Sequence, residues 1–170
     1  MKPIPNMKIK TKNRTITDKT EIKKFLEKYD LYTELWEPEN VDKSILDPLL
    51  RYKNQIETLK KKFGYASADC CSMDSNTPNL DKMLAPFKKE HHHSDDEVRF
   101  TVEGEGIFGV NPLTDPPFEV YVQTGDLLVV PANTRHWFEL TEEKNICCLR
   151  IFKENPKWEA IYDMPIKSGV

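Results

Sequence analysis

Apolar residues in the first third of the chain recur at helical spacing. Between positions 17 and 32 they fall at intervals of three and four, which predicts an amphipathic helix, and Asp18 with Glu21 resembles a capping box at its start. The apolar face of this helix consists of Ile22, Phe25, Leu26 and Tyr29. A second helix is predicted within residues 42–63, with Gly64 placed to end it. Its stripe is formed by Leu49, Tyr52, Ile56, Leu59 and Phe63.

The pattern changes at Tyr65 to short β-prone runs separated by turn residues, with no helical spacing between them. The runs predict six or seven strands: YASADCCSM, EVRFTVEG, GIFGV, FEVYVQTG, DLLVVPAN, RHWFEL and NICCLRIF. The segment NPLTDPPFE is too rich in proline for a regular element and is expected to form a loop on the rim. This organisation predicts a mainly β fold, an antiparallel barrel or jelly roll with the helices packed outside.

Length, charge and cysteines narrow the class of protein. The 170 residues suit one domain, 1–170, with a mostly helical segment over 1–64 and a barrel core over 65–165. A net charge of −3 provides no positive field for nucleic acid or an anionic membrane, so a small-molecule partner is expected. No apolar stretch approaches a signal sequence or a membrane span, and the four cysteines form adjacent pairs that suit a reducing compartment. A soluble cytoplasmic protein is expected.

Three of the four histidines stand together in KEHHHSDDEVRF, residues 89–100. A charged run of this kind can be a solvated surface patch. If the backbone is extended, however, alternate side chains share a face, and His92 points away from the others. The shared face then carries His91, His93, Glu97 and Arg99. The fourth histidine, His136, follows a turn and a strand that could return the chain to the same place. Imidazole and carboxylate ligands together suit iron, nickel, manganese or zinc.

Two motifs in these segments resemble those of the cupin barrel family. The pattern His-X-His, three residues, Glu, six residues, Gly is met by His91, His93, Glu97 and Gly104. The second cupin motif is matched by Gly125, Pro131 and His136. Asn133 replaces the glycine of that motif and Leu140 a frequent asparagine, but neither is a ligand, and asparagine tolerates the left-handed backbone of a turn. The resemblance implies a cupin-type barrel with His91, His93, Glu97 and His136 on one metal ion.

A longer pattern is similar to the acireductone dioxygenase family of the cupins. That family typically reads F-x-x-E-H-x-H-x-x-x-E-x-R, and the chain matches it with Phe87, Glu90, His91, His93, Glu97 and Arg99. The similarity covers residues 60–165. It implies an enzyme of methionine salvage that uses one Fe(II) or Ni(II) and cleaves 1,2-dihydroxy-3-keto-5-methylthiopentene with O2. The Fe form would give formate and 2-keto-4-methylthiobutyrate; the Ni form would give methylthiopropionate, carbon monoxide and formate.

The likeness also suggests roles for individual residues. A Lewis-acidic ion would favour the deprotonated enediolate, and Arg99 would neutralise its charge, although Arg99 could instead form a structural ion pair with Asp95 or another carboxylate. A general base stays open among Glu97, Asp96 and a hydroxide on the metal. Nickel should bind at least as tightly as iron, so the sequence does not choose the metal.

The substrate pocket is expected to be aromatic. Phe138 shares the parity of His136 and should face inward, while Trp137 faces outward or onto a helix. The family resemblance adds Phe87 and Trp158 to this pocket, and aromatic rings around it would suit a methylthio tail. Ordinary core packing explains each of these aromatic residues taken alone equally well. Arg150 also has a counterpart in the family, but whether its side chain points inward depends on a strand register that the sequence does not fix.

Rival functions remain open from the sequence. Metal cupins also isomerise sugar phosphates, which would require several Lys, Arg and Asn side chains around the site. A non-catalytic, metabolite-binding cupin is a third reading, because fold alone does not imply function. The run GEGIFG fits a dinucleotide fingerprint, but no helix follows it. Its glycines are expected to serve turns and bulges. By family likeness the protein is expected to be a monomer.

Overall fold

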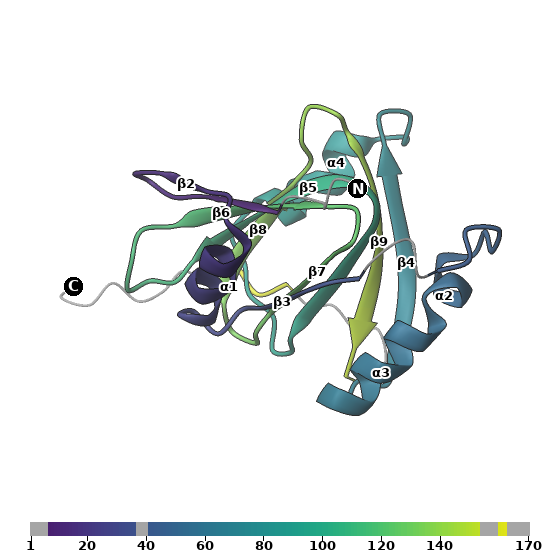
Figure 1. Ribbon diagram of the computed structural model, residues 1–170. Helices are drawn as coiled ribbons and strands as arrows, with labels where there is room; N and C mark the ends of the chain where they lie inside the picture. Colours follow the sequence, from purple (N-terminus) through teal and green to yellow (C-terminus); the bar gives the residue numbers. More distant parts are fainter. Residues whose placement is uncertain (1–6, 37–40, 154–159, 163–170) are drawn as a thin grey trace.

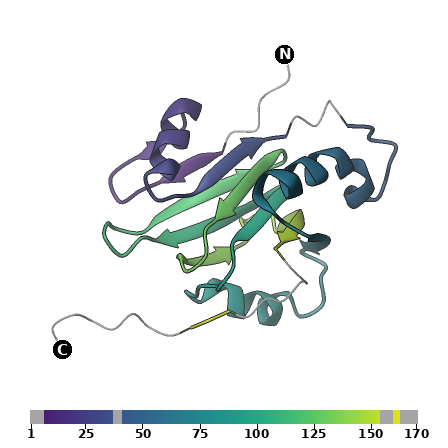
Figure 2. The same ribbon diagram turned by 90° about the horizontal axis from the view of Figure 1, so that it is seen from below.

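In the computed structural model, which describes residues 7–36, 41–153 and 160–162, the chain forms a curled, antiparallel half-barrel sheet with a few short helices (Figures 1 and 2). The mainly β, cupin-type prediction is therefore confirmed. The elements are β1 Lys8–Lys10, β2 Thr15–Ile16, α1 Lys19–Glu27, β3 Tyr32–Leu35, α2 Pro48–Arg51, α3 Lys53–Phe63, β4 Ser67–Asp74, α4 Leu80–Lys88, β5 Glu97–Asn111, β6 Phe118–Gln123, β7 Asp126–Val130, β8 Arg135–Glu139 and β9 Asn145–Phe152. Within the described residues, no helix has the length and apolar character needed to span a membrane.

Helices α1 and α3 begin or end at residues that the sequence marks. The Asp18 side chain accepts a hydrogen bond from the Glu21 backbone N–H at 2.9 Å, which caps α1, and Ile22 and Leu26 are buried. Gly64 adopts a left-handed conformation, with φ of 75°, and terminates α3. The second predicted helix is divided at Tyr52 into α2 and α3. In both views α1 and α3 lie on opposite sides of the molecule (Figures 1 and 2).

Two features depart from the sequence prediction. The N-terminal segment contains strands as well as helices: β1 pairs with β2 and β6, and β3 pairs with β7. These strands are two to four residues long, too short for an alternation to stand out. The expectation of no helix after Tyr65 is wrong, because α4 covers Leu80–Lys88. Pro86 argued against a helix in this segment, since a proline normally breaks a helix. In the structure Pro86 lies in the last turn of α4. The division of one domain at residues 64 and 65 stays a prediction.

Strand β5 joins two runs that the sequence presents separately, EVRFTVEG and GIFGV. Its first half pairs with β7 and β9, and its second half pairs with β6 and β8. The register shifts between Thr101 and Glu103, and Gly104 has a φ of 82°. A Cβ on Gly104 would lie 2.1 Å from the Asn145 carbonyl oxygen, so only glycine fits. The bulge explains why odd-numbered residues face the interior before it and even-numbered residues face the interior after it.

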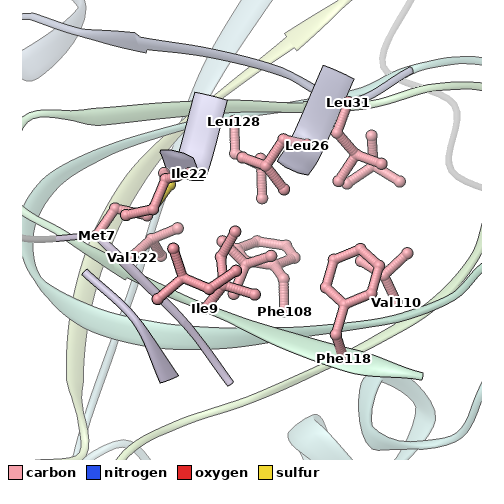
Figure 3. Packing of buried hydrophobic residues seen from close by; sticks show 13 residues of the cluster. Met7, Ile9, Ile22, Leu26, Leu31, Phe108, Val110, Phe118, Val122 and Leu128 are labelled. Atoms are coloured by element: carbon pink, nitrogen blue, oxygen red, sulfur yellow. The ribbon is translucent and has the colours of Figure 1, made fainter. Parts of the chain in front are cut away.

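Two large apolar clusters and a smaller third one, formed by Met73, Leu84, Ile146 and Cys148, account for the buried apolar clusters of the described residues. The inner core lies between the curled sheet and α1 (Figure 3) and contains Met7, Ile9, Ile16, Ile22, Leu26, Leu31, Phe108, Val110, Phe118, Val120, Val122, Leu128 and Val130. The outer core joins the convex face of the sheet to α3 and contains Trp36, Tyr52, Ile56, Leu59, Tyr65, Val98, Phe100, Val102, Leu127, Val129, Leu149 and Ile151. Strand β7 contributes Leu127 and Val129 to the outer core and Leu128 and Val130 to the inner core, so its apolar residues are buried on both faces.

Candidate metal centre

Four potential metal ligands converge from two distant segments. His91 and His93 precede β5, Glu97 begins it, and His136 lies on β8. The backbones of His91 and His136 form an isolated bridge with two N–H to carbonyl hydrogen bonds of 2.9 and 2.8 Å. All four side chains are buried. The predicted set of metal ligands is therefore brought together, and a solvated surface patch is excluded.

The geometry suits one ion. One ligand atom from each residue lies within 4.8 Å of every other, and the three imidazole centroids are 4.6 to 5.1 Å apart. Glu97 Oε2 lies 2.5 Å from His136 Nε2 and 3.1 Å from His93 Nε2. Ligand atoms bound at about 2.0–2.2 Å on opposite sides of an ion are separated by slightly more than 4 Å, so shifts of a few tenths of an ångström would complete the site.

Two histidines are oriented by backbone carbonyls. His91 Nδ1 lies 2.6 Å from the Lys89 carbonyl, and His136 Nδ1 lies 2.8 Å from the Thr134 carbonyl. A carbonyl oxygen only accepts, so each Nδ1 donates its proton and the Nε2 atom is left for the centre of the cluster. Outer hydrogen bonds of this kind hold metal-binding imidazoles in proteins. The donor set therefore fits a divalent ion.

Burial and charge act differently on the individual ligands. Burial lowers the pKa of His91 to about 4, so this imidazole is neutral at pH 7 and able to bind a metal. Burial alone would raise the pKa of Glu97, but Arg99 and His136 outweigh it and hold the pKa well below its ordinary value. Burial opposes protonation of His136, yet its contact with Glu97 raises the pKa. The carboxylate is thus ionised and carries the negative charge of the site.

Arg99 lies beside the cluster, as its parity predicts. Its Nη2 is 3.1 Å from Glu97 Oε1, and the side chain is buried. Among the described residues its carboxylate partner is Glu97 and not Asp95, so the ion pair with another carboxylate that the sequence left open is present. Since Glu97 faces His93 and His136 through Oε2, its two oxygens divide between the ligand cluster and the guanidinium.

Neighbours of the ligands serve other purposes. His92 is not part of the cluster, and its backbone pairs with Ile161. Asp96 accepts hydrogen bonds from the Tyr65 hydroxyl at 3.1 Å and the Ala132 N–H at 3.0 Å, which link it to the end of β7. Glu90 accepts from Asn111 at 2.8 Å and from Arg135 at 2.9 Å. Glu90 thus joins the start of the ligand segment to β5 and β8, a positioning contact that sequence analysis missed, although the family pattern included this residue.

A cavity of about 160 Å³ adjoins the cluster at Glu97. Its volume suits a small metabolite, below the range of about 300–1,000 Å³ for drug-sized ligands. Its lining residues are Cys71, Met73, Met83, Phe87, Glu97, Arg99, Thr101, Phe108, Phe138, Ile146, Cys148 and Arg150. The predicted pocket residues Phe87, Phe138 and Arg150 thus line this cavity, whereas Trp158 lies outside the described residues. Their part in binding substrate stays a prediction.

The sulfur-containing part of the lining was not predicted. Cys71, Met73 and Cys148 lie on β4 and β9, and Met83 lies on the unpredicted α4. The pairing of Cys71 with Cys148 and of Asp69 with Arg150 settles the register that the sequence left open. Arg150 then shares the face of Cys148. All four cysteines are free thiols.

Comparisons with known proteins agree along nearly the whole chain. The family model described as the ARD/ARD′ family matches residues 4–160, which include all four clustered ligands. An acireductone dioxygenase from Sulfurihydrogenibium sp. (strain YO3AOP1) is 43% identical, and the match covers 88% of this chain and 89% of the relative. An acireductone dioxygenase from Bacillus cytotoxicus is 37% identical, with coverages of 88% and 95%.

A solved structure extends this likeness to the fold. Acireductone dioxygenase from Bacillus anthracis with a cadmium ion in its active centre superposes with a TM-score of 0.81 at 33% identity. The match covers 95% of this chain and 100% of that protein. The similarity therefore includes the curled sheet together with the strands that present the clustered ligands.

Proposed function

Because the chain belongs to the ARD/ARD′ family of acireductone dioxygenases, we propose that its substrate is 1,2-dihydroxy-3-keto-5-methylthiopentene, an intermediate of methionine salvage. With Fe(II) and O2 the proposed products are formate and 2-keto-4-methylthiobutyrate. With Ni(II) they are methylthiopropionate, carbon monoxide and formate. The observation that carries the proposal is the buried group of three histidines and Glu97 beside a small, mainly apolar cavity.

The charges around the cavity suit an anionic chelating substrate. His91, His93, Glu97 and His136 would hold a divalent ion, which would supply a Lewis acid that favours the deprotonated enediolate of the substrate. Arg99 and Arg150 both line the cavity and offer guanidinium groups to substrate oxygens. Glu97 Oε1 pairs with Arg99 Nη2, which keeps the arginine turned toward the cluster. We assign the catalytic roles to Glu97 and Arg99.

The remaining cavity lining suits the methylthio tail. Phe87 and Phe138 contribute aromatic rings, while Met73 and Met83 contribute thioethers. Sulfur packs favourably against aromatic rings, so this wall favours a thioether over a hydroxylated chain. We place Trp158 in the same pocket on the family resemblance alone.

We propose one Fe(II) or Ni(II) ion per chain. Three imidazoles and one carboxylate suit both ions, and neither requires a thiolate. The cadmium ion in the Bacillus anthracis relative belongs to that protein and does not identify the metal used here. We further propose that the protein is a monomer in the cytoplasm. Its proposed partners are the acireductone and O2, and we propose no binding to nucleic acid or to a membrane.

A sugar-phosphate isomerase is less well supported by the cavity. A phosphorylated, hydroxyl-rich substrate requires many polar partners, whereas the described lining contains two arginines but neither lysine nor asparagine, and it is mainly apolar. A non-catalytic metabolite-binding protein would not need a buried arginine beside a complete ligand set. Neither alternative gains support from a separate observation.

Oxygen uptake tests the proposal directly. The purified protein is loaded with Fe(II), supplied with the acireductone and followed with an oxygen electrode while formate and the keto acid are measured. We expect O2 and acireductone to disappear in equal amounts, and an anaerobic sample to form no product. Conversion without O2 would indicate an isomerase. Binding without conversion under air would support the non-catalytic reading.

A further inference from the structure

Three charged residues form a row across three neighbouring strands beside the metal centre. Arg99 on β5 is directly opposite Arg150 on β9, and Arg150 is directly opposite Asp69 on β4. Opposed residues of an antiparallel pair share a face, so all three lie on the face that carries the cavity. Both arginines line the cavity itself.

Asp69 holds Arg150 with two hydrogen bonds. Arg150 Nε donates to Asp69 Oδ1 at 2.6 Å, and Arg150 Nη2 donates to Asp69 Oδ2. A two-bond contact between a carboxylate and the planar guanidinium fixes the plane of the arginine as well as its position. The guanidinium also lies 5.5 Å from the centre of the Phe152 ring. Arg150 is therefore oriented before any ligand enters.

The charges of the row are arranged in pairs. Arg99 has Glu97 as its carboxylate partner, and Arg150 has Asp69. Two arginines facing each other across adjacent strands repel, and partial burial strengthens that repulsion. Each carboxylate offsets it for one arginine. Glu97 lies on the metal side of the row and Asp69 on the far side, so the two guanidinium groups occupy the middle, at the cavity wall.

We propose that Asp69 is a positioning residue for substrate binding: it holds Arg150 opposite Arg99, so that two guanidinium groups face the oxygens of the anionic acireductone. This inference rests on the proposed function. Asp69 itself does not line the cavity and acts only through Arg150. Its loss should therefore weaken substrate binding while it leaves metal binding and the chemical step largely intact.

The Asp69→Asn variant tests this role. We expect KM for the acireductone to rise about tenfold, with kcat within about twofold of wild type, because the amide loses the charge and one of the two acceptors. Under anaerobic conditions, the Kd of the acireductone for Ni(II)-loaded protein should rise by a similar factor, while the Ni(II) content stays at the wild-type level. Asp69→Glu should recover most of the affinity. The matched control is Asp115→Asn, which removes a remote contact with Lys28 and Tyr29.

A double-mutant cycle separates positioning from general stability. In an Arg150→Met background, Asp69→Asn should change KM by less than about twofold, since the residue through which it acts is absent. Arg150→Lys, which keeps the charge but lacks the planar fork, should resemble Asp69→Asn and remains informative if that variant fails to fold.

The outcomes are distinguishable. An unchanged or lower KM in Asp69→Asn would overturn the inference, as would an equal effect of that substitution in the Arg150→Met background. If the wild-type protein neither binds nor converts the acireductone, the proposed function fails and this inference fails with it. If the wild-type protein converts the acireductone and Asp69→Asn is silent, only the inference fails.

Discussion

The two faces of the first half of β5 are similarly buried but chemically opposite. Val98 and Phe100 are both 0% exposed in the outer core, whereas Glu97 and Arg99 are 4% and 9% exposed beside the cavity. On the outer face, burial of apolar surface favours folding by roughly 25 cal/mol per Å². On the inner face, burial of charge opposes folding unless each ion has a partner. Burial alone therefore does not distinguish a structural residue from a functional one, whereas the chemistry of the buried groups does.

This contrast assigns different tasks to alternate residues of one strand. The outer face packs against Trp36 and Tyr52 through close aromatic contacts and lies in the same apolar cluster as Ile56 and Leu59 of α3. The inner face uses that rigid support to hold charged groups at fixed separations. Substitutions on the outer face should thus change stability but preserve the metal site, and substitutions on the inner face should remove function even in a folded protein.

Glu97→Gln should have the largest effect. The amide keeps the shape of the side chain but loses the negative charge that faces His93, His136 and Arg99. We expect turnover to fall by about 1,000-fold or more, with a reduced metal content, because a ligand and a buried counter-charge are lost together. Metal analysis and oxygen uptake check this result. Glu103→Gln, on the same strand but exposed, is the control. A normal metal content in Glu97→Gln would contradict the assignment of this ligand.

Phe100→Ala tests the opposite face. The ring centroid of Phe100 lies 4.4 Å from that of Trp36 and 4.6 Å from that of Tyr52. Its removal should lower the free energy of unfolding by about 3–5 kcal/mol, measured by urea denaturation. At a temperature where the variant stays folded, its metal content should match wild type. Leu46→Ala is the control, since that side chain is 84% exposed. Loss of metal from folded Phe100→Ala would show that the two faces are not independent.

Arg99→Ala should separate metal binding from catalysis. The variant keeps all four ligands, so we expect a wild-type metal content, but turnover should fall by about 100-fold because the cation beside the substrate is lost. Steady-state oxygen uptake and metal analysis provide the two measurements. Arg14→Ala removes an exposed ion pair and serves as the control. A fully active Arg99→Ala enzyme would reduce Arg99 to a structural partner of Glu97.

Removal of metal should reveal how much the inner face depends on its ion. A chelator is expected to lower the melting temperature by several degrees, and added Ni(II) should restore it, since a ligand at about 100 times its Kd stabilises the folded state by about 2.7 kcal/mol. Differential scanning fluorimetry measures both changes. The Glu97→Gln variant should respond little. A wild-type protein with the same melting temperature under all conditions would indicate that no ion contributes to its stability.

The sequence predicts the inner face better than its surroundings. His91, His93, Glu97 and Arg99 follow the period of two, and the motif that contains His136 completes the cluster, so local pattern and family likeness were sufficient. The face occupied by Phe138 follows from the same parity. Asp18 and Gly64 likewise determine the ends of their helices through local backbone chemistry.

Features that depend on strand pairing were not predictable. The direction of Arg150 follows from its register with Arg99 and Asp69, which no local pattern specifies. Strands β1 and β2 are too short to carry an alternation, and their place beside β6 is set by tertiary contacts. Helix α4, which supplies Phe87 and Met83 to the cavity, was missed because Pro86 is normally incompatible with a helix interior. The sequence alone thus identifies the metal ligands, whereas strand pairing and the packing of α4 determine which residues line the cavity.

Asp126→Asn extends the comparison to a buried carboxylate that has no arginine partner among the described residues. Burial raises the pKa of Asp126 from 3.8 to about 7. The hydrogen bond that Asp126 accepts from the Gln123 N–H at 2.7 Å and the charge of Lys19 both lower this pKa, but burial outweighs them. Glu97 shows the opposite shift, because Arg99 and His136 outweigh burial.

The direction of the pH effect follows from the raised pKa of Asp126. Between pH 4 and 7 the unfolded chain releases this proton while the folded chain keeps it, so the free energy of unfolding falls as pH rises and levels off above the folded pKa. Asparagine keeps an acceptor for Gln123 but cannot ionise. The stability of Asp126→Asn relative to wild type should therefore increase by about 2 kcal/mol between pH 5 and pH 7, measured by urea unfolding. Exposed Asp74→Asn is the control. If the free energies of unfolding of Asp126→Asn and wild type depend on pH in the same way, the pKa of Asp126 is not raised by folding. The contrast with the lowered pKa of Glu97 would then not be explained by burial of Asp126.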